Sequence, residues 1–149
     1  MQAALDIVTI LSVGLMIGTE FAVSAFVNPI LGQLDGRAEA DATRLFARRL
    51  GRAMPFWYIL GFVLMVVEAS IRRHEAGAAW IVTALFIFAF VILMTLLFLV
   101  PINNRIAQAQ EQVFSDSLKR QHATWDLLHR GRVLLLVVAM ALFLVGIRA

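Results

Sequence analysis

Apolar residues concentrate in four stretches of the chain, and charged residues concentrate between them. A bilayer core about 30 Å thick needs roughly 20 helical residues to cross it. Two stretches have that length, and the other two reach it when their flanks are included. The pattern predicts an all-α, integral membrane four-helix bundle that forms one domain over residues 1–149, with helices at about 4–32, 55–72, 78–101 and 124–147.

Two polar segments connect the expected helices on one side of the membrane. In residues 39–53, apolar and basic positions alternate with helical spacing, which predicts an amphipathic helix lying on an anionic membrane surface. Residues 102–123 form a polar link whose weak helical periodicity could continue helix three into the cytoplasm, although Pro101 is expected to interrupt the helix before it.

Composition supports the membrane assignment, because 61% of the residues are hydrophobic and only 15% are charged. The chain has no cysteine, which excludes disulfides, thiolate nucleophiles and cysteine-ligated metals. The basic residues lie in loops and do not form one stripe, so nucleic acid is not an expected partner.

The distribution of basic residues predicts the orientation in the membrane. Ten of the 13 follow helix one or lie between or beside helices three and four: Arg37, Arg44, Arg48, Arg49, Arg52, Arg105, Lys119, Arg120, Arg130 and Arg132. The other three are Arg72, Arg73 and Arg148. Positive charge is retained in the cytoplasm, so both larger loops are predicted there and both termini outside.

Two carboxylates within the apolar stretches need partners. Glu20 lies far from either end of helix one, on the face that also carries Ser24 and Asn28. It is expected to face the bundle interior, either as a neutral group bonded to a neighbouring helix or as a proton acceptor or metal ligand. Glu68 lies four residues before Arg72, a spacing that predicts a local ion pair.

Helix four opens with a set of functional side chains. Trp125, His129 and Arg132 follow one another at i, i+4 and i+7, and His122 shares part of that face. In an alternating bundle, eight side chains would converge at one end: Glu20, Ser24, Asn28, Tyr58, either Asn103 or Asn104, Trp125, His129 and Arg132. Such a set suits an acidic phenol or enol whose anion is held by Arg132 while His129 moves a proton. The same set could instead brace the bundle, and Tyr58 could belong to an interfacial aromatic belt.

Cofactor and assembly are left open by the sequence. The H-E-x-x-H motif and the Glu-x-x-His pairs of di-iron bundles are absent. A metal, if there is one, would use His129, Glu20 and His122. A haem with two axial histidines from different helices is disfavoured, because His74 is expected at the end of the bundle opposite His122 and His129. The sequence thus leaves three alternatives for the cofactor: none, a metal or haem. Transport by so short a chain would require a homo-oligomer.

Three motifs in order carry a resemblance to a known family. The chain has V-N-P after helix one, V-P-I-N-N at the end of helix three and W-x-x-x-H-x-x-R opening helix four. This set resembles the DUF1772, or anthrone oxygenase-like, family of small four-helix membrane proteins. The matching positions are Asn28, Pro29, Pro101, Asn104, Trp125, His129 and Arg132. The resemblance implies oxidation of anthrones to anthraquinones, the activity of characterised fungal members.

Two functions are therefore expected. The first is a membrane-embedded oxygenase or oxidase that acts on a lipophilic aromatic or quinol-like molecule, with His129, Arg132 and Glu20 as catalytic residues. Asn28, Tyr58, Asn104 and Trp125 would then bind the substrate. The alternative is a non-catalytic bundle that binds lipid or a partner membrane protein. Both place the protein in a bilayer, and the bacterial inner membrane is the expected location.

Overall fold

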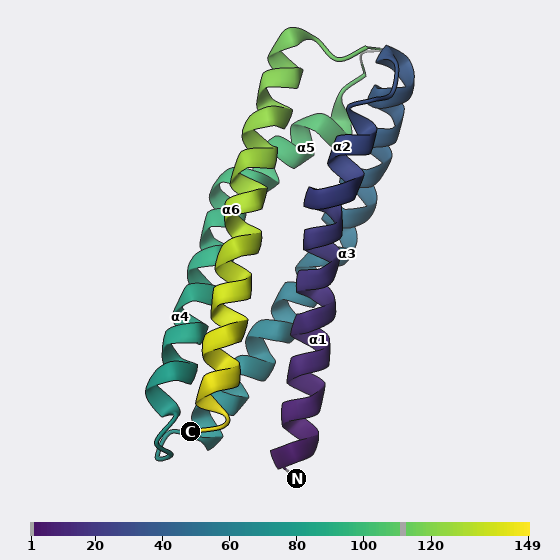
Figure 1. Ribbon diagram of the computed structural model, residues 1–149. Helices are drawn as coiled ribbons and strands as arrows, with labels where there is room; N and C mark the ends of the chain where they lie inside the picture. Colours follow the sequence, from purple (N-terminus) through teal and green to yellow (C-terminus); the bar gives the residue numbers. More distant parts are fainter. Residues whose placement is uncertain (1, 111–112) are drawn as a thin grey trace.

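The computed structural model describes residues 2–110 and 113–149, which form four long antiparallel helices without strands (Figure 1). The first combines α1 (Gln2–Ala22), the π-helical turn η1 (Val23–Val27) and α2 (Asn28–Leu31), and the second is α3 (Gly36–Ile71). The third combines α4 (Ala78–Met94), the π-helical turn η2 (Thr95–Leu99) and α5 (Val100–Gln108), and the fourth is α6 (Asp116–Gly146). The predicted helical bundle is confirmed.

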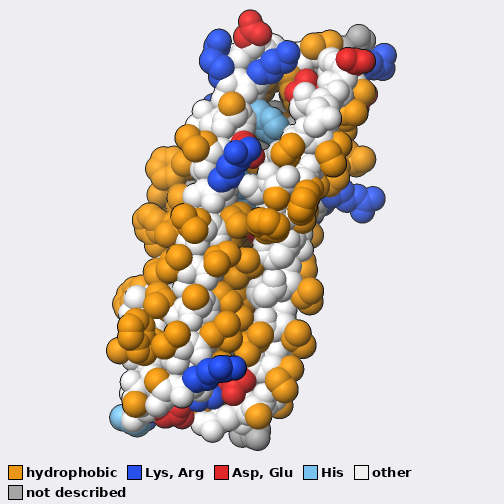
Figure 2. Space-filling model, viewed as in Figure 1, with side chains coloured by type: hydrophobic (Ala, Val, Ile, Leu, Met, Phe, Trp, Pro, Cys, Tyr) orange, Lys and Arg blue, Asp and Glu red, His pale blue; other side chains and the backbone are white. Residues whose placement is uncertain are grey.

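The helices pack as two neighbouring pairs, with α1 beside α3 and α4 beside α6, and both termini lie at the same end (Figure 1). The core is apolar and includes Met16, Met65, Phe88, Leu136 and Phe143. Apolar side chains also cover much of the outer face, while charged ones gather toward the two ends (Figure 2). All four helices are long and apolar enough to cross a membrane, as expected of an integral membrane protein. The side on which the termini lie stays a prediction.

The amphipathic segment is not a separate surface helix. Residues 39–53 belong to α3, which runs without interruption through Pro55. Ala40 and Ala47 are buried and pack against Ile106 and Phe114, so the small-residue face of this segment lies against the end of the third helix. The expected break between this segment and helix two is absent, and its packing partner could not be seen in the local sequence. Contact of the segment with a membrane surface stays a prediction.

The third and fourth helices extend further into the polar link than expected. The third helix continues past Pro101 to Gln108, and α6 begins at Asp116, not near residue 124. Ser115 caps α6, since its hydroxyl accepts a hydrogen bond from the Leu118 backbone N–H at 3.5 Å. Only residues 109–115 separate the two helices, and residues 111–112 lie outside the described structure.

Each of the two π-helical turns precedes a proline. The Asn28 N–H bonds to the Val23 carbonyl, and the Val100 N–H bonds to the Thr95 carbonyl, both five residues back. Pro29 and Pro101 follow directly, and a proline ring would clash with the carbonyl four residues before it in a regular helix. A wider turn accommodates the ring, so both helices continue and do not end.

The end of the bundle that holds the termini is closed by ion pairs around Arg72. Its guanidinium bonds to Asp6 at 2.7 Å, to Glu75 at 2.8 Å and to Glu68 at 3.2 Å, which confirms the predicted Glu68–Arg72 pair. Burial lowers the pKa of Arg72, but these hydrogen bonds outweigh it and raise the pKa above its ordinary value. Thr9 donates a further hydrogen bond to Glu68 at 3.3 Å.

Candidate functional site

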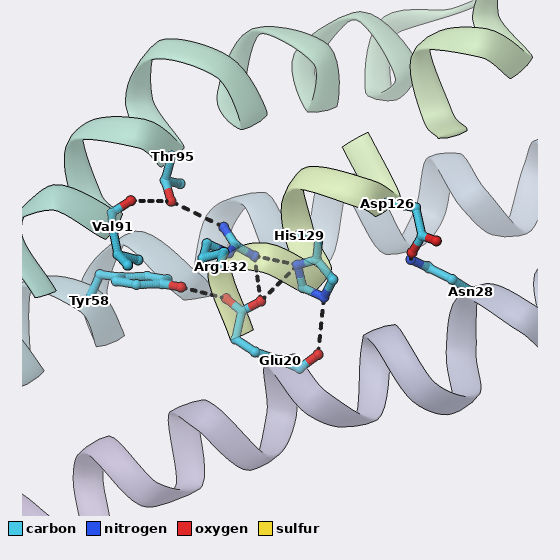
Figure 3. A network of polar contacts seen from close by, with 8 residues as sticks. All are labelled: Glu20, Asn28, Tyr58, Val91, Thr95, Asp126, His129 and Arg132. Atoms are coloured by element: carbon cyan, nitrogen blue, oxygen red, sulfur yellow. Dashed lines mark hydrogen bonds and ion pairs between the residues drawn. The ribbon is translucent and has the colours of Figure 1, made fainter. Parts of the chain in front are cut away.

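A buried polar cluster lies where the first three long helices meet α6 (Figure 3). Glu20 comes from α1, Tyr58 from α3, Thr95 from η2, and His129 and Arg132 from α6. Glu20, Tyr58, His129 and Arg132 are all at most 6% exposed. Because the bilayer offers no water to satisfy such groups, they must satisfy one another or a ligand.

Arg132 and Glu20 form the central ion pair. Arg132 Nη2 donates to Glu20 Oε2, and the Tyr58 hydroxyl donates to Glu20 Oε1 at 3.0 Å. Arg132 Nη1 donates to the Thr95 hydroxyl at 3.3 Å, which in turn donates to the Val91 carbonyl at 2.7 Å. The guanidinium carbon also lies 5.7 Å from the Tyr58 ring centre, a cation–π distance. Both charges of the pair are therefore held by several partners.

Both ring nitrogens of His129 contact neighbouring polar groups. Nδ1 lies 2.7 Å from Arg132 Nη2, and an arginine nitrogen can only donate, so Nδ1 accepts. Nε2 lies 3.0 Å from the Glu20 backbone carbonyl, which can only accept, so Nε2 carries the proton. The Arg132 contact therefore fits a neutral ring with its proton on Nε2, although Nδ1 also lies 3.2 Å from Glu20 Oε2.

Aromatic stacking extends from His129 along α6. The Trp125 ring lies 4.7 Å from the His129 ring at an interplanar angle of 11°, and the His122 ring lies 6.2 Å from the Trp125 ring at 12°. Asn28 donates to Asp126 at 2.8 Å and thereby joins the first helix to α6 (Figure 3). Asp126 also pairs with Arg130 at 2.7 Å.

The cluster forms part of the wall of a cavity of about 260 Å³. Apolar side chains from α3, α4, η2 and α5 form most of its lining. The polar lining residues and tryptophan are Thr19, Glu20, Tyr58, Thr95, Asn103, Trp125 and Arg132. His129 does not line the cavity and lies behind Arg132 and Glu20. A ligand in this space would meet one polar wall and would otherwise contact hydrocarbon.

The structure brings most of the expected site residues together. Glu20, Tyr58, His129 and Arg132 are in direct contact, and Trp125 stacks on His129. The main difference concerns the V-P-I-N-N motif, because Asn104 is exposed and does not line the cavity.

Asn103 takes the place expected of Asn104. It lines the cavity and donates from Nδ2 to the Ala47 carbonyl of α3 at 3.1 Å. Sequence reasoning also missed Thr95, although a threonine in so apolar a stretch is a signal that it needs a polar neighbour. The bond between Asp126 and Asn28 could not be foreseen either, because helical spacing relates Asp126 only to residues of its own helix.

A metal is poorly accommodated by the residues in contact. Among residues 2–110 and 113–149, no group of three or more His, Asp or Glu side chains is arranged to hold a metal ion. Glu20 and His129 are both bonded to the Arg132 guanidinium, a cation that would repel a metal ion. His122 lies beyond the Trp125 ring and does not join them.

Together these features define a small helical membrane protein with a buried carboxylate, guanidinium and imidazole beside an apolar cavity. The chain belongs to the anthrone oxygenase family, whose model matches residues 42–142, more than half of the chain. The matched region contains Tyr58, Thr95, Trp125, His129 and Arg132, whereas Glu20 precedes it. No curated protein and no solved structure matches the chain.

Proposed function

We propose that the protein is a membrane-embedded oxygenase or oxidase that acts on a lipophilic aromatic or quinol-like molecule of the anthrone type. Family membership supports this reaction class, and the apolar cavity with one polar wall supports this substrate class. The cavity of about 260 Å³ is close to the lower limit of about 300 Å³ for small-molecule sites, which favours a compact ligand.

The observation that carries the proposal is the state of Arg132. Arg132 is one of the residues that line the cavity, and its buried Nε–H has no hydrogen-bond partner within the described residues. A buried donor without an acceptor is costly, and a phenolate or enolate oxygen is an acceptor that also matches the positive charge. Arg132 would therefore stabilise the anion formed when the substrate loses a proton.

The proton would pass to Glu20 and then to His129. Glu20 lines the cavity, whereas His129 Nδ1 lies behind it, 3.2 Å from Glu20 Oε2 and 2.7 Å from Arg132 Nη2. In the proposed sequence, the ring methylene of the substrate gives up a proton, and the electron-rich anion combines with O2 to form a peroxide anion. That anion takes the proton back, and the hydroperoxide loses water to leave the carbonyl group of a quinone.

Substrate would enter from the bilayer. The cavity lining includes Ile59 and Leu96, which are 62% and 59% exposed on the apolar outer surface. A hydrophobic molecule dissolved in lipid would then reach the cavity between α3 and the third helix without crossing water. Placement in a bacterial inner membrane with both termini outside, and assembly as a homo-oligomer, belong to the same proposal.

The test is oxygen uptake by the purified protein in lipid nanodiscs supplied with anthrone. Wild-type protein is expected to consume one O2 for each anthraquinone formed, and Arg132→Gln to lower the rate about 100-fold. Arg130→Gln is the matched control, because Arg130 lies on the same helix with its side chain 58% exposed. Equal rates in the wild type and Arg132→Gln, or uptake unchanged in His129→Ala, would overturn the mechanism.

The bracing function also has an observation in its favour. Glu20, Tyr58, Thr95 and Arg132 come from all four long helices, so their bonds would hold a lipid-binding or partner-binding bundle together. In that case His129→Ala would lower the melting temperature in detergent while the wild type turned over no substrate. Measuring melting and oxygen uptake on the same samples separates the two functions.

A further inference from the structure

A second, smaller cavity of about 40 Å³ adjoins the first. The two share Val23, Leu50, Asn103 and Trp125 as lining residues, so these side chains form a common wall. The smaller cavity has a different character, because the polar residues Asn28, Thr43, Asn103 and His122 are among those that line it.

Thr43 gives an independent indication of what this cavity binds. The residue is only 5% exposed, and its hydroxyl oxygen has no hydrogen-bond partner within the described residues. Other threonines in these helices, such as Thr83 and Thr124, donate to a carbonyl of their own helix. A buried hydroxyl that makes no such bond points to a small polar ligand beside it.

The size and the polar lining of the smaller cavity suit water as its ligand. A buried water needs at least roughly 10–15 Å³ of such space and two to four polar partners. The cavity therefore has room for about two or three waters, and its hydroxyl, amide and imidazole groups can serve as partners. An aromatic substrate would not fit in this volume.

We propose that the smaller cavity holds ordered water and is the route by which product water leaves the substrate cavity. The second part rests on the proposed function, since oxidation of one methylene by one O2 yields one carbonyl and one water. Water formed beside apolar walls has few partners there, whereas the adjoining cavity offers several.

In this proposal, the Asn103 side chain determines whether water passes between the two cavities at their common wall. Its side chain is fixed by the bond to the Ala47 carbonyl and lies over Gly51, where an added Cβ would come within 2.9 Å of Asn103 Nδ2. The lining beyond it includes His122, near the start of α6, and Ile106, near the end of α5. The start of α6 and the end of α5 lie toward the end of the bundle opposite the termini (Figure 1).

Water binding is tested by stability, where the sign of the effect is informative. If Thr43 binds water, Thr43→Val removes a hydrogen bond and lowers the melting temperature by about 2–4 °C. If the cavity is dry, the same change removes an unsatisfied hydroxyl and raises the melting temperature. Thr124→Val is the control, since that hydroxyl is exposed and bonds to the Arg120 carbonyl at 3.0 Å. A melting temperature equal to or above that of the wild type would overturn the proposal.

The exit route is tested by turnover in the same nanodisc assay. Asn103→Leu is expected to lower kcat at saturating anthrone about tenfold, and Asn103→Ser, which keeps a polar group at the wall, to restore most of it. An unchanged kcat in Asn103→Leu beside an active wild type would overturn the exit route alone. An inactive wild type would refute the proposed function, while the Thr43→Val result would still decide whether water is bound.

Discussion

At the scale of single residues, Glu20 is the group on which most of the cluster depends. One of its carboxylate oxygens accepts from Tyr58 and the other from Arg132, and its backbone carbonyl accepts from His129. Its carboxylate and backbone together therefore fix side chains from α3 and α6. Loss of its charge would leave the Arg132 guanidinium buried without a counterion.

Glu20→Gln is expected to destabilise the protein by about 3–5 kcal/mol, the usual effect of removing one partner of a buried ion pair. Glu20→Gln combined with Arg132→Gln should cost less than the sum of the two single changes, because neither partner then remains charged. The measurement is reversible unfolding in detergent micelles. Glu75→Gln, at an ion pair whose carboxylate side chain is 41% exposed, should have a much smaller effect. Additive costs would contradict a direct pairing.

The residues of the site could be predicted to the extent that regular helical spacing holds. Trp125, His129 and Arg132 share a face because α6 is regular from Asp116 to Gly146. In a regular helix the residue seven positions after Thr95 would be Ile102, but η2 adds one residue to a turn, so Asn103 shares the cavity with Thr95. Hydropathy does not reveal a π-helical turn, so the sequence left Asn103 and Asn104 as alternatives, and the family resemblance favoured Asn104.

Asn103 and Asn104 can be distinguished directly. Asn103→Ala should weaken anthrone oxidation several-fold more than Asn104→Ala, because only Asn103 lines the cavity. The measurement compares kcat/KM for oxygen uptake at matched protein concentration. A larger loss in Asn104→Ala would mean that the third helix has a different rotation from the one described.

At the scale of elements, close approach of helices determines where glycine is required. A Cβ built on Gly77, just before α4, would lie 1.8 Å from the Gly146 carbonyl oxygen at the end of α6. The pairing of α4 with α6 at this end therefore depends on the absence of a side chain. Gly14, in contrast, has nothing within 4 Å of an added Cβ.

Gly77→Ala is expected to lower the free energy of unfolding by about 1–3 kcal/mol through steric overlap with the backbone of α6. Gly14→Ala is the control and should be neutral or stabilising by up to about 1 kcal/mol, since alanine favours the helical state. Chemical unfolding in micelles measures both changes. Equal stability of the two variants would contradict the close approach of α4 and α6.

At the scale of the whole molecule, two groups of charges lie at opposite ends of an apolar bundle (Figure 2). The bundle itself was predictable, because four apolar stretches of sufficient length leave few alternatives. The predicted orientation of the bundle in the membrane depends on the distribution of the 13 basic residues. Weak helical periodicity allowed the third helix to continue into the polar link, but the sequence could not show how far α3 and α5 extend, since that depends on packing between Ala47 and Ile106.

Orientation can be measured with single cysteines, because the natural chain has none. A membrane-impermeant maleimide added to intact cells is expected to label His74→Cys and to leave Arg49→Cys unlabelled until the membrane is disrupted. Both positions are exposed in the structure. The opposite pattern would place the Arg-rich end outside.

Both chain ends lie at the same end of the bundle (Figure 1). Two copies can therefore be joined head to tail by a flexible linker that stays on one membrane surface, without an added transmembrane segment. Such a tandem protein would let a single inactivated copy be paired with an intact one at fixed stoichiometry. Half the activity of the intact tandem would indicate that each bundle works alone, and complete loss would indicate that the copies depend on each other.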